Sequence, residues 1–434
     1  MATRNKTSRR SVLKAGAALA PAVALAPAAA LAPVVAPAKG VDVVGRTADE
    51  SSSAASAGRV RQGPHVVVIG AGAFGGWTAL TLLRSGARVT LCDTWGPGHS
   101  RASSGGESRV IRHTYGERIY VDWVIRALDL WRESQERWGR RLYHETGVLW
   151  MVPGDEGFEV DALEHVRAAG VVHERLNAAE FARRYPQINP ENVRWAIYEP
   201  EAGYLLARRG CEAVAEAFVA EGGEYRQAAC RVVDAADGEM RSVDLSDGAR
   251  LSADAYVFAC GPWLGKVFPD LMDALITPTR QEVYYFGTPA GISDYDRGTM
   301  PVWADSAGRF WYGIPGGERR GFKMADDQHG AVVDPTTQDR RSSNESIARA
   351  REYLEFRFPG MRGAPFIEGR VCQYENSPDG NFIIDRHPRA ANAWIVGGGS
   401  GHGYKHGPAL GEYVARLVLQ DGRTDTLFAL DRFA

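Results

Sequence analysis

The sequence predicts an α/β protein whose chain also builds a second, largely antiparallel sheet. Residues 66–93 show a strand, a glycine-rich turn, a helix and a second strand, which is typical of a dinucleotide-binding unit. Residues 280–325 contain several strand-like runs with no helix between them, which indicates a separate sheet. Residues 392–422 contain a strand, a glycine-rich loop and a helix, so the α/β pattern recurs near the C-terminus.

The first strand, residues 66–69, is an uninterrupted apolar run, which favours a buried parallel strand. Gly70, Gly72 and Gly75 follow in G-x-G-x-x-G spacing. The first glycine allows the tight turn, the second lets the backbone approach a pyrophosphate, and the third lets the helix pack on the strand. Asp93 ends the second strand, where a carboxylate accepts hydrogen bonds from a ribose. These features predict a bound dinucleotide but do not distinguish FAD from NAD.

The middle of the chain mixes helices and strands. Residues 119–138 carry apolar side chains at helical spacing and predict one long packed helix. The other predicted elements are a strand over 145–152, a helix over 207–222, an antiparallel meander over 225–251, a buried strand over 256–260 and a helix over 341–356. Gly261 follows the buried strand, where the chain passes close to a cofactor or simply makes a strand-to-helix turn.

The N-terminus has a different composition from the rest of the chain. Residues 1–38 have the layout of a secretory signal peptide, and Arg9 and Arg10 resemble the twin-arginine consensus. Residues 39–64 predict a flexible linker. We therefore expect the twin-arginine export machinery of a bacterium to deliver the folded protein to the cell envelope or the medium. The alternative is a basic pair before a disordered Ala/Pro arm.

The composition argues against several classes of protein. The 434 residues suggest two or three domains, and the formal net charge of −2 argues against a nucleic-acid groove. No window after the N-terminus is apolar for long enough to span a membrane, and no H-E-x-x-H motif or Cys/His cluster predicts a metal site. The five cysteines show no pairing pattern; four of them are predicted to be core residues, namely Cys92, Cys211, Cys230 and Cys260.

Several separated stretches together resemble one known family. They are VIGAGAFGG, SRVIRHTYGE, ETGVLW, VFACGPW, YGIPGG…GFK, CQYENSPDGNFIID and GGGSGHGYK. From residue 65 onward the chain is similar to the FAD-dependent amine and amino-acid oxidases of the monomeric sarcosine oxidase and N-methyltryptophan oxidase group. The resemblance implies a doubly wound FAD-binding domain interrupted by a substrate domain on a mixed or antiparallel sheet. The implied bounds are 65–148, 204–278 and 370–434 for the first domain and 149–203 and 279–369 for the second.

The resemblance also implies how the cofactor is held. Cys372 lies in the C-x-Y stretch, where the family cysteine bonds through sulfur to the flavin 8α-methyl group, so covalent FAD is expected. A buried free thiol is the alternative. The other implied cofactor-binding residues are Gly70, Gly72, Gly75, Asp93, Arg109, Val232, Gly261, Gly401 and Gly403. The last two would leave room for the isoalloxazine ring.

Polar residues receive implied roles in the same way. Arg112 and Lys405 match residues that hold a substrate carboxylate, and arginine suits a bidentate clamp. Lys323 matches a lysine whose positive charge promotes oxygen reduction. A surface salt bridge for Arg112 and a solvated charge for Lys323 are the alternatives. The remaining implied residues are His402 at the flavin pyrimidine edge, and Tyr312 and Tyr374 beside the substrate.

Three departures from the family pattern bear on the substrate. Asp327 stands where the family often has a histidine, Trp303 where small-substrate members have a methionine, and Ile314 in place of an aromatic. The pocket is therefore not expected to be that of a sarcosine enzyme. We predict an oxidase of a secondary amine or amino acid, N-alkyl or cyclic, that reduces O2 to H2O2. A flavin dehydrogenase of an amino or hydroxy acid and a flavoprotein with little turnover are the alternatives.

Overall fold

A computed structural model describes residues 63–434, except for the side chains of residues 232–236. The predicted signal peptide, residues 1–38, and the predicted linker up to residue 62 lie outside the described residues. Within the described part, no helix is both long and apolar enough to cross a membrane.

A six-stranded sheet forms the first layer of the fold, in the order β19-β20-β13-β1-β2-β9. Its strands are β1 (His65–Ile69), β2 (Arg88–Asp93), β9 (Glu224–Gln227), β13 (Ala255–Phe258), β19 (Ile383–His387) and β20 (Ala390–Gly397). All neighbouring pairs are parallel except β19 with β20. All five residues of β1 are buried, as expected for a central parallel strand covered on both faces. The predicted doubly wound sheet is confirmed.

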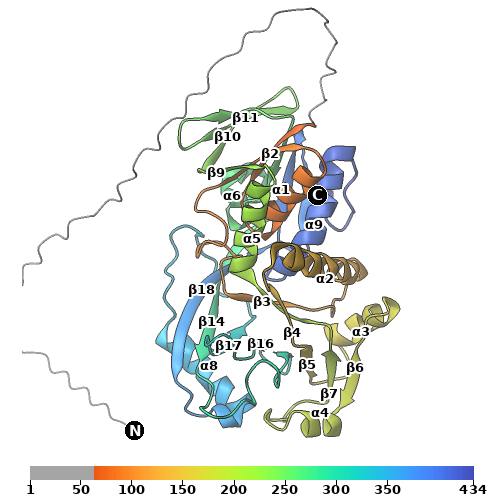
Figure 1. The fold of residues 1–434 in the computed structure, drawn as a ribbon, viewed down its shortest axis with the longest axis vertical. Helices are drawn as coiled ribbons and strands as arrows, with labels where there is room; N and C mark the ends of the chain where they lie inside the picture. The colour runs from red at the N-terminus through yellow and green to blue at the C-terminus, as the bar shows by residue number, and fades with distance from the viewer. Residues whose placement is uncertain (1–62) are drawn as a thin grey trace, which may run out of the picture. The chain divides into compact units, whose positions relative to one another are not determined.

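Helices cover this sheet. They are α1 (Ala73–Arg84), α2 (Arg118–Trp138), α5 (Ala207–Ala220) and α9 (Gly407–Gln420). In Figure 1, α1 (orange) and α9 (blue) lie side by side, and α1 also contacts α5. The rings of Trp77 and Trp131 meet edge to face at 5.0 Å between centroids, which fixes α2 against α1. This packing holds the N-terminal end of α1 at the carboxyl edge of the sheet.

An eight-stranded sheet forms the second large layer, in the order β18-β14-β17-β16-β15-β5-β7-β6. The strands are β5 (Val148–Val152), β6 (Glu174–Asn177), β7 (Trp195–Glu199), β14 (Thr277–Phe286), β15 (Val302–Asp305), β16 (Trp311–Ile314), β17 (Phe322–Asp326) and β18 (Phe366–Asn376). Only β5 and β15 pair in parallel, so the sheet is mixed, within the prediction. α8 (Asn344–Arg357) packs beside β17, and Trp303, Phe322 and Phe358 form part of the shared core.

Smaller elements connect the two layers. The remaining strands are β3 (Ser108–Ile111), β4 (Tyr143–Glu145), β8 (Gly203–Leu206), β10 (Cys230–Ala236), β11 (Glu239–Leu245) and β12 (Arg250–Leu251). The remaining helices are α3 (Phe158–Ala168), α4 (Ala178–Arg184), α6 (Leu264–Val267) and α7 (Pro269–Met272), with short 3-10 turns at Gly261–Trp263, Pro359–Met361, Tyr404–His406 and Leu430–Phe433. β3, β8 and β4 form a three-stranded sheet that places Arg109 and Arg112.

Two predicted elements differ from the structure. The strand expected over 145–152 is divided into β4 and β5, which belong to different sheets. The meander expected over 225–251 begins only at β10, because β9 pairs in parallel with β2 in the six-stranded sheet. β9 directly follows α5, and its parallel pairing with the distant strand β2 takes the place of the expected local hairpin. The long helix over 119–138 is confirmed as α2.

Candidate functional site

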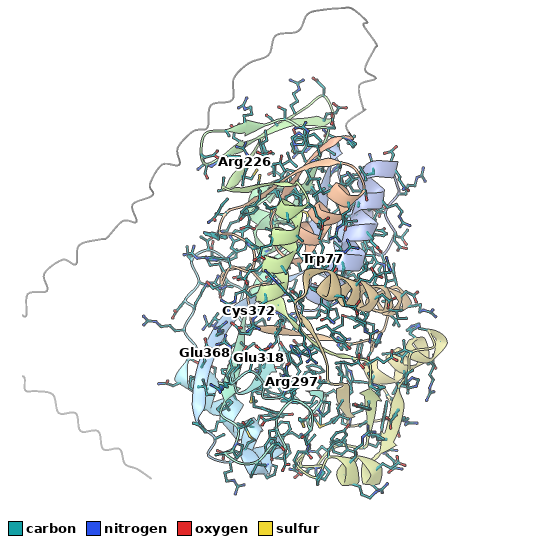
Figure 2. The ribbon with its side chains drawn as sticks, viewed as in Figure 1. Trp77, Arg226, Arg297, Glu318, Glu368 and Cys372 are labelled. Carbon is teal, nitrogen blue, oxygen red and sulfur yellow. The ribbon has the colours of Figure 1, made fainter. Side chains whose placement is uncertain are left out.

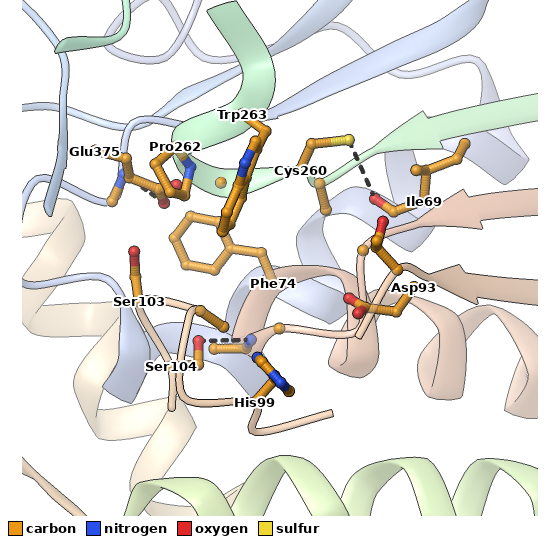
Figure 3. Close-up of a pocket in the computed structure, with 18 of the residues that line it drawn as sticks. Ile69, Phe74, Asp93, His99, Ser103, Ser104, Cys260, Pro262, Trp263 and Glu375 are labelled. Carbon is orange, nitrogen blue, oxygen red and sulfur yellow. Dashed lines mark hydrogen bonds between the residues drawn. The ribbon is translucent and has the colours of Figure 1, made fainter. Parts of the chain in front are cut away.

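A cavity of about 490 Å³ opens at the carboxyl ends of β1, β2 and β13. Gly70 follows β1 with φ +108°, and a Cβ at this position would lie inside the contact distance of the Ala259 carbonyl. Only glycine fits there, so the turn passes tightly below the cavity. Gly72 caps α1 without a side-chain hydrogen bond, and it lines the cavity, whose wall also contains Asp93 and Ser104 (Figure 3). A helix N-terminus with open backbone beside it suits a phosphate.

Asp93 lies on the cavity wall at the end of β2. Its Oδ2 accepts a hydrogen bond from the N–H of Ala71 at 2.8 Å, and its Oδ1 accepts from the N–H groups of Trp95 and Gly96, each at 2.8 Å. The carboxylate therefore orders both loops at this end of the cavity. The predicted contact with a ribose stays a prediction, and it would use the remaining lone pairs of the same group.

The other end of the cavity lies against the glycine-rich loop, residues 398–403. A Cβ on Gly401, which has φ +78°, would lie 2.5 Å from Cε2 of Tyr374, and a Cβ on Gly403 would lie 2.6 Å from Cζ of Phe74. Both glycines therefore allow the loop to pack against aromatic rings, in addition to lining the cavity. Glu375 also lies here, buried; it was not singled out from the sequence because its burial depends on long-range strand pairing.

A second cavity of about 420 Å³ adjoins the first, because Arg109, Tyr374, Gly401 and Tyr404 line both. Its aromatic wall comes from Trp150, Phe158 and Phe310, and its polar residues include Arg112, Tyr115, Asp327, His402 and Lys405. A molecule bound in the second cavity would thus lie next to a molecule bound in the first cavity. This is the arrangement needed to bring a small substrate against a cofactor.

Arg112 is held by aromatic rings rather than by a carboxylate. Its guanidinium lies 4.3 Å from the ring centroid of Tyr115 and 4.8 Å from that of Trp150. Among residues 63–434, no acidic side chain forms an ion pair with Arg112. Glu199, which is fully buried, accepts hydrogen bonds from the N–H groups of His113 at 2.6 Å and Thr114 at 3.2 Å. Glu199 was not predicted from the sequence, and it fixes the segment that carries Arg112.

Lys405 and His402 meet at the Tyr115 hydroxyl. Lys405 Nζ donates to this oxygen at 2.8 Å and to the His402 carbonyl at 2.7 Å, and Nδ1 of His402 lies 3.3 Å from the same hydroxyl. Burial lowers the pKa of His402 to about 3, so the imidazole is neutral at neutral pH. Burial and the Arg112 guanidinium together lower the pKa of Lys405 well below its usual value.

Asp327 places a carboxyl group in the wall of the second cavity. The Tyr374 hydroxyl donates a hydrogen bond to its Oδ1 at 2.7 Å. Burial raises the pKa of Asp327, and the neighbouring Arg112 and Lys405 charges oppose that rise. A substrate in this cavity therefore meets the Arg112 guanidinium, the Lys405 amino group and one carboxyl group.

Cys372 lies on β18 (Figure 2). It lines a third cavity of about 710 Å³. Its Sγ lies 3.6 Å from Nη2 of Arg109, whose guanidinium also donates to the carbonyls of Ser103 and Ser108. The fully buried Lys323 donates from Nζ to the Ser108 carbonyl at 2.8 Å. Burial, with the Arg109 charge second, lowers the pKa of Lys323 well below its usual value.

The structure brings most predicted site residues to these cavities. Gly70, Gly72, Asp93, Arg109, Gly261, Gly401 and Gly403 line the first cavity, and Arg109, Arg112, Tyr312, Tyr374, Gly401, His402 and Lys405 line the second. Gly75 lies behind the turn, Lys323 lines none of the three cavities, and the side chain of Val232 lies outside the described part. Within residues 63–434, no group of three or more His, Cys, Asp or Glu side chains could hold a metal ion.

Comparisons with known proteins agree with this geometry. Residues 65–417 match the family of FAD dependent oxidoreductases. The chain is 30% identical over 377 residues to monomeric sarcosine oxidase of Bacillus sp. (strain B-0618), covering 85% of this chain and 95% of that protein. It is 28% identical over 393 residues to N-methyl-L-tryptophan oxidase of Salmonella dublin, covering 85% and 99%.

Solved structures share the fold. The crystal structure of L-proline dehydrogenase from P. horikoshii superposes with a TM-score of 0.75 at 20% sequence identity, covering 86% of this chain and 98% of that chain. The family match spans both large sheets and both adjoining cavities. The chain therefore belongs to the family of FAD-dependent oxidoreductases.

Proposed function

We propose that the protein is an FAD-dependent oxidase of a secondary amine or amino acid, N-alkyl or cyclic, which forms an imine and reduces O2 to H2O2. The observation that carries this proposal is the second cavity, which adjoins the first and is lined by Arg112, a residue with no acidic ion-pair partner within residues 63–434. The names of the relatives specify sarcosine and N-methyl-L-tryptophan, which are both N-methyl amino acids.

The residues of the first cavity fit FAD. The tight turn at Gly70 and the open N-terminus of α1 would hold the phosphates, and the glycine-rich loop 398–403 would approach the ring system. The buried Oε2 of Glu375 has no partner among the described residues, so this end of the cavity calls for a polar ligand. When bound, FAD supplies a two-electron acceptor for the C–H bond next to the substrate nitrogen.

Arg112 and Lys405 would hold the substrate carboxylate. Arginine binds a carboxylate through two parallel hydrogen bonds, which orients the substrate as well as retaining it. Asp327 lies in the same cavity, so its carboxylate would accept a hydrogen bond from the substrate nitrogen. The aromatic wall of Trp150, Phe158 and Phe310 adds apolar surface that a glycine derivative would not fill. This supports a substrate with a larger side chain or ring than sarcosine.

Cys372 is proposed to hold FAD through a thioether to the 8α-methyl carbon. Reactive cysteines lie in partly exposed positions beside cationic side chains, and Cys372 has Arg109 at 3.6 Å. Burial raises the pKa of Cys92, Cys211 and Cys230 to about 12, so those thiols are unreactive by comparison. Bond formation removes the thiol hydrogen and one methyl hydrogen, and the two electrons leave through the flavin to O2.

Lys323 is proposed to promote the reaction with oxygen. A positive charge fixed in a site without water stabilises negative charge as it develops on oxygen. The lowered pKa of Lys323 makes this role dependent on pH, since only the protonated form carries the charge. The second candidate function, a dehydrogenase that passes electrons to another acceptor, would not need this charge.

A peroxide-release screen tests the proposal. The purified mature protein is incubated with N-alkyl and cyclic amino acids and with the matching amines that lack a carboxylate, and H2O2 is measured. We expect peroxide with amino acids, and a strongly raised KM for Arg112→Met because a charge-assisted pair is lost. Substrate oxidation without peroxide, but with an artificial acceptor, would favour the dehydrogenase. Unchanged kinetics of Arg112→Met would favour a simple amine as substrate.

Export is a separate proposal. The paired Arg9 and Arg10, followed by a weakly apolar stretch, support transport of the folded holoprotein to the cell envelope or the medium. A cofactor made in the cytoplasm has to be bound before export, which favours a route for folded proteins. The domain bounds given above also remain proposals; β18, with Cys372, lies in the eight-stranded sheet.

A further inference from the structure

Glu375 has one carboxyl oxygen without a hydrogen-bond partner within residues 63–434, and it lines the first cavity, which we call the cofactor cavity because its residues fit FAD. It lies near the end of β18, is 8% exposed and lines the cavity wall next to Pro262 (Figure 3). Its Oε1 accepts a hydrogen bond from the N–H of Gly399 at 3.2 Å. Its Oε2 is buried and has no hydrogen-bond partner within residues 63–434. Buried polar atoms of native proteins are almost always paired, so a partner is missing.

Two backbone segments close around this carboxyl. A Cβ at Gly261 would lie 2.7 Å from Oε2, and a Cβ at Gly399 would lie 2.8 Å from Oε1. Any larger residue at either position would overlap the carboxyl oxygens, so both positions require glycine. No protein side chain can therefore approach Oε2 from these two segments, and Glu375 lines the cavity. A molecule bound in the cavity is the candidate for the missing partner.

The surroundings favour the protonated form of this carboxyl. No cationic side chain within the described range forms an ion pair with Glu375. The titratable groups on the segments packed against it are the buried Cys260 thiol and the Tyr374 hydroxyl, whose pKa values burial raises, and His402, whose pKa burial lowers to about 3. None of these supplies a positive charge. β14, which pairs with β18, carries Arg280, and Arg109, Arg231 and Lys266 line the same cavity, but none of these four side chains forms an ion pair with Glu375. Burial raises the pKa of Glu375 to about 7, and the phosphates of FAD would raise it further.

We propose that Glu375 is a protonated carboxylic acid that donates a hydrogen bond from Oε2 to FAD, and that it positions the cofactor and tunes its reduction. A carboxylic acid held neutral by its site can act as a hydrogen-bond donor at neutral pH. Hydrogen bonds to a charged acceptor are about twice as strong as those between neutral groups. FAD gains negative charge on reduction, so Glu375 binds the reduced cofactor more strongly than the oxidised one. The proposal rests on FAD binding, but not on the amine substrate.

The midpoint potential of the bound FAD tests this role without any substrate. The holoprotein is reduced chemically at pH 7 and the potential is read from the flavin absorbance. Glu375→Gln keeps a neutral donor of similar shape, and its potential is expected to match the wild type. Glu375→Leu removes the donor and should weaken binding of reduced FAD about tenfold more than that of oxidised FAD, a fall of about 30 mV. Glu352→Gln and Glu352→Leu, on the exposed face of α8, are the matched controls.

Infrared difference spectra between oxidised and reduced holoprotein give an independent measurement. We expect the C=O stretching band of a protonated carboxylic acid in the wild type, absent in Glu375→Gln and present in Glu352→Gln. If the midpoint potentials of Glu375→Gln and Glu375→Leu both equal that of the wild type, the proposal is overturned, because Glu375 would then not contact FAD. A potential raised by Glu375→Gln would also overturn it, since that result means an ionised carboxylate. If Glu375→Leu does not fold, the infrared band decides.

Discussion

Cys372 differs from the other four cysteines in what its sulfur touches. The Arg109 guanidinium lies beside it, whereas Cys211 is buried on α5. We expect the wild-type protein to keep its yellow colour in the pellet after acid precipitation, and Cys372→Ser to release FAD into the supernatant. Cys211→Ser, the control, should keep the flavin. Free FAD from the wild type would contradict the thioether and leave the family assignment unaffected.

Lys323 is buried, so its charge depends on pH more strongly than that of a surface lysine. Its folded pKa is lowered, so the protonated form dominates below that pKa and is lost as pH rises through it. We expect the rate constant for reoxidation by O2 to fall with rising pH, and Lys323→Met to lower it on the order of 10²-fold. Anaerobic reduction by substrate should change little.

Lys323→Arg is the matched variant for that prediction, because it keeps the charge but not the shape. It should retain more of the reoxidation rate than Lys323→Met, and its rate should not fall over the same pH range, since a guanidinium stays protonated. Wild-type reoxidation by Lys323→Met would show that the lysine is structural. The dehydrogenase alternative would then gain support.

Asp327 contributes a carboxyl group to the second cavity. Its pKa is raised, and the carboxylate form, which can accept a hydrogen bond from the substrate nitrogen, forms only as pH rises through that pKa. We expect kcat/KM to rise across this pKa in the wild type, and this limb to disappear in Asp327→Asn. Asp326→Asn is the control, because Asp326 pairs with Arg309 and does not line this cavity. If the rise of kcat/KM with pH persists in Asp327→Asn, another group is responsible for it.

At the scale of elements, the pattern of neighbouring side chains in the sequence predicts individual strands, turns and helices. The apolar run over residues 66–69 and the glycines after it specify a parallel strand and a tight turn within 10 residues of chain, by the rules of local spacing. The spacing of apolar side chains likewise specifies α2. In both cases the structure follows the prediction because the spacing of neighbouring side chains indicates the type of element, although the partner strand β13 lies far away in sequence.

Other features depend on partners that are distant in sequence. β18 pairs with β14 from Thr277 opposite Asn376 to Phe286 opposite Phe366, and this register turns Glu375 toward the cofactor cavity. Glu199 ends β7, which pairs with β5 and β6 in the eight-stranded sheet, and it is buried there. It accepts a hydrogen bond from the N–H of His113, 86 residues earlier. A single sequence does not show which distant strands pair, so neither Glu375 nor Glu199 could be predicted from it. Arg112 and Lys405 were predicted only because they match residues of the family.

The glycine-rich loop gives a prediction at this scale. Gly401→Ala places a Cβ 2.5 Å from the Tyr374 ring at a positive φ, so the loop must shift. We expect it to lower the free energy of unfolding by about 2–4 kcal/mol, combining backbone strain and overpacking, and to change the flavin absorbance spectrum. Gly139→Ala, at φ +60° with nothing within 4 Å, isolates the strain and should cost about 1–2 kcal/mol. Equal melting temperatures for the two variants would contradict the packing argument.

At the scale of the whole molecule, the cofactor cavity joins residues from Ile69 to Tyr404. Its walls come from both ends of the chain and from the end of β18, so they exist together only in the folded protein. Binding of FAD and folding are therefore coupled, and any ligand of the folded state stabilises it by mass action. The cofactor has to be acquired where both the folded chain and free FAD are present.

That coupling leads to the prediction for export. The twin-arginine route carries folded proteins, so changing Arg9 and Arg10 together to lysine should leave yellow holoprotein in the cytoplasm, although both positive charges remain. The measurement is flavin absorbance and protein abundance in the cytoplasmic and exported fractions. Arg4→Lys, the control, makes the same chemical change outside the pair and should not alter export. Normal export of the double variant would show that another route delivers the protein, which would then have to acquire FAD after transport.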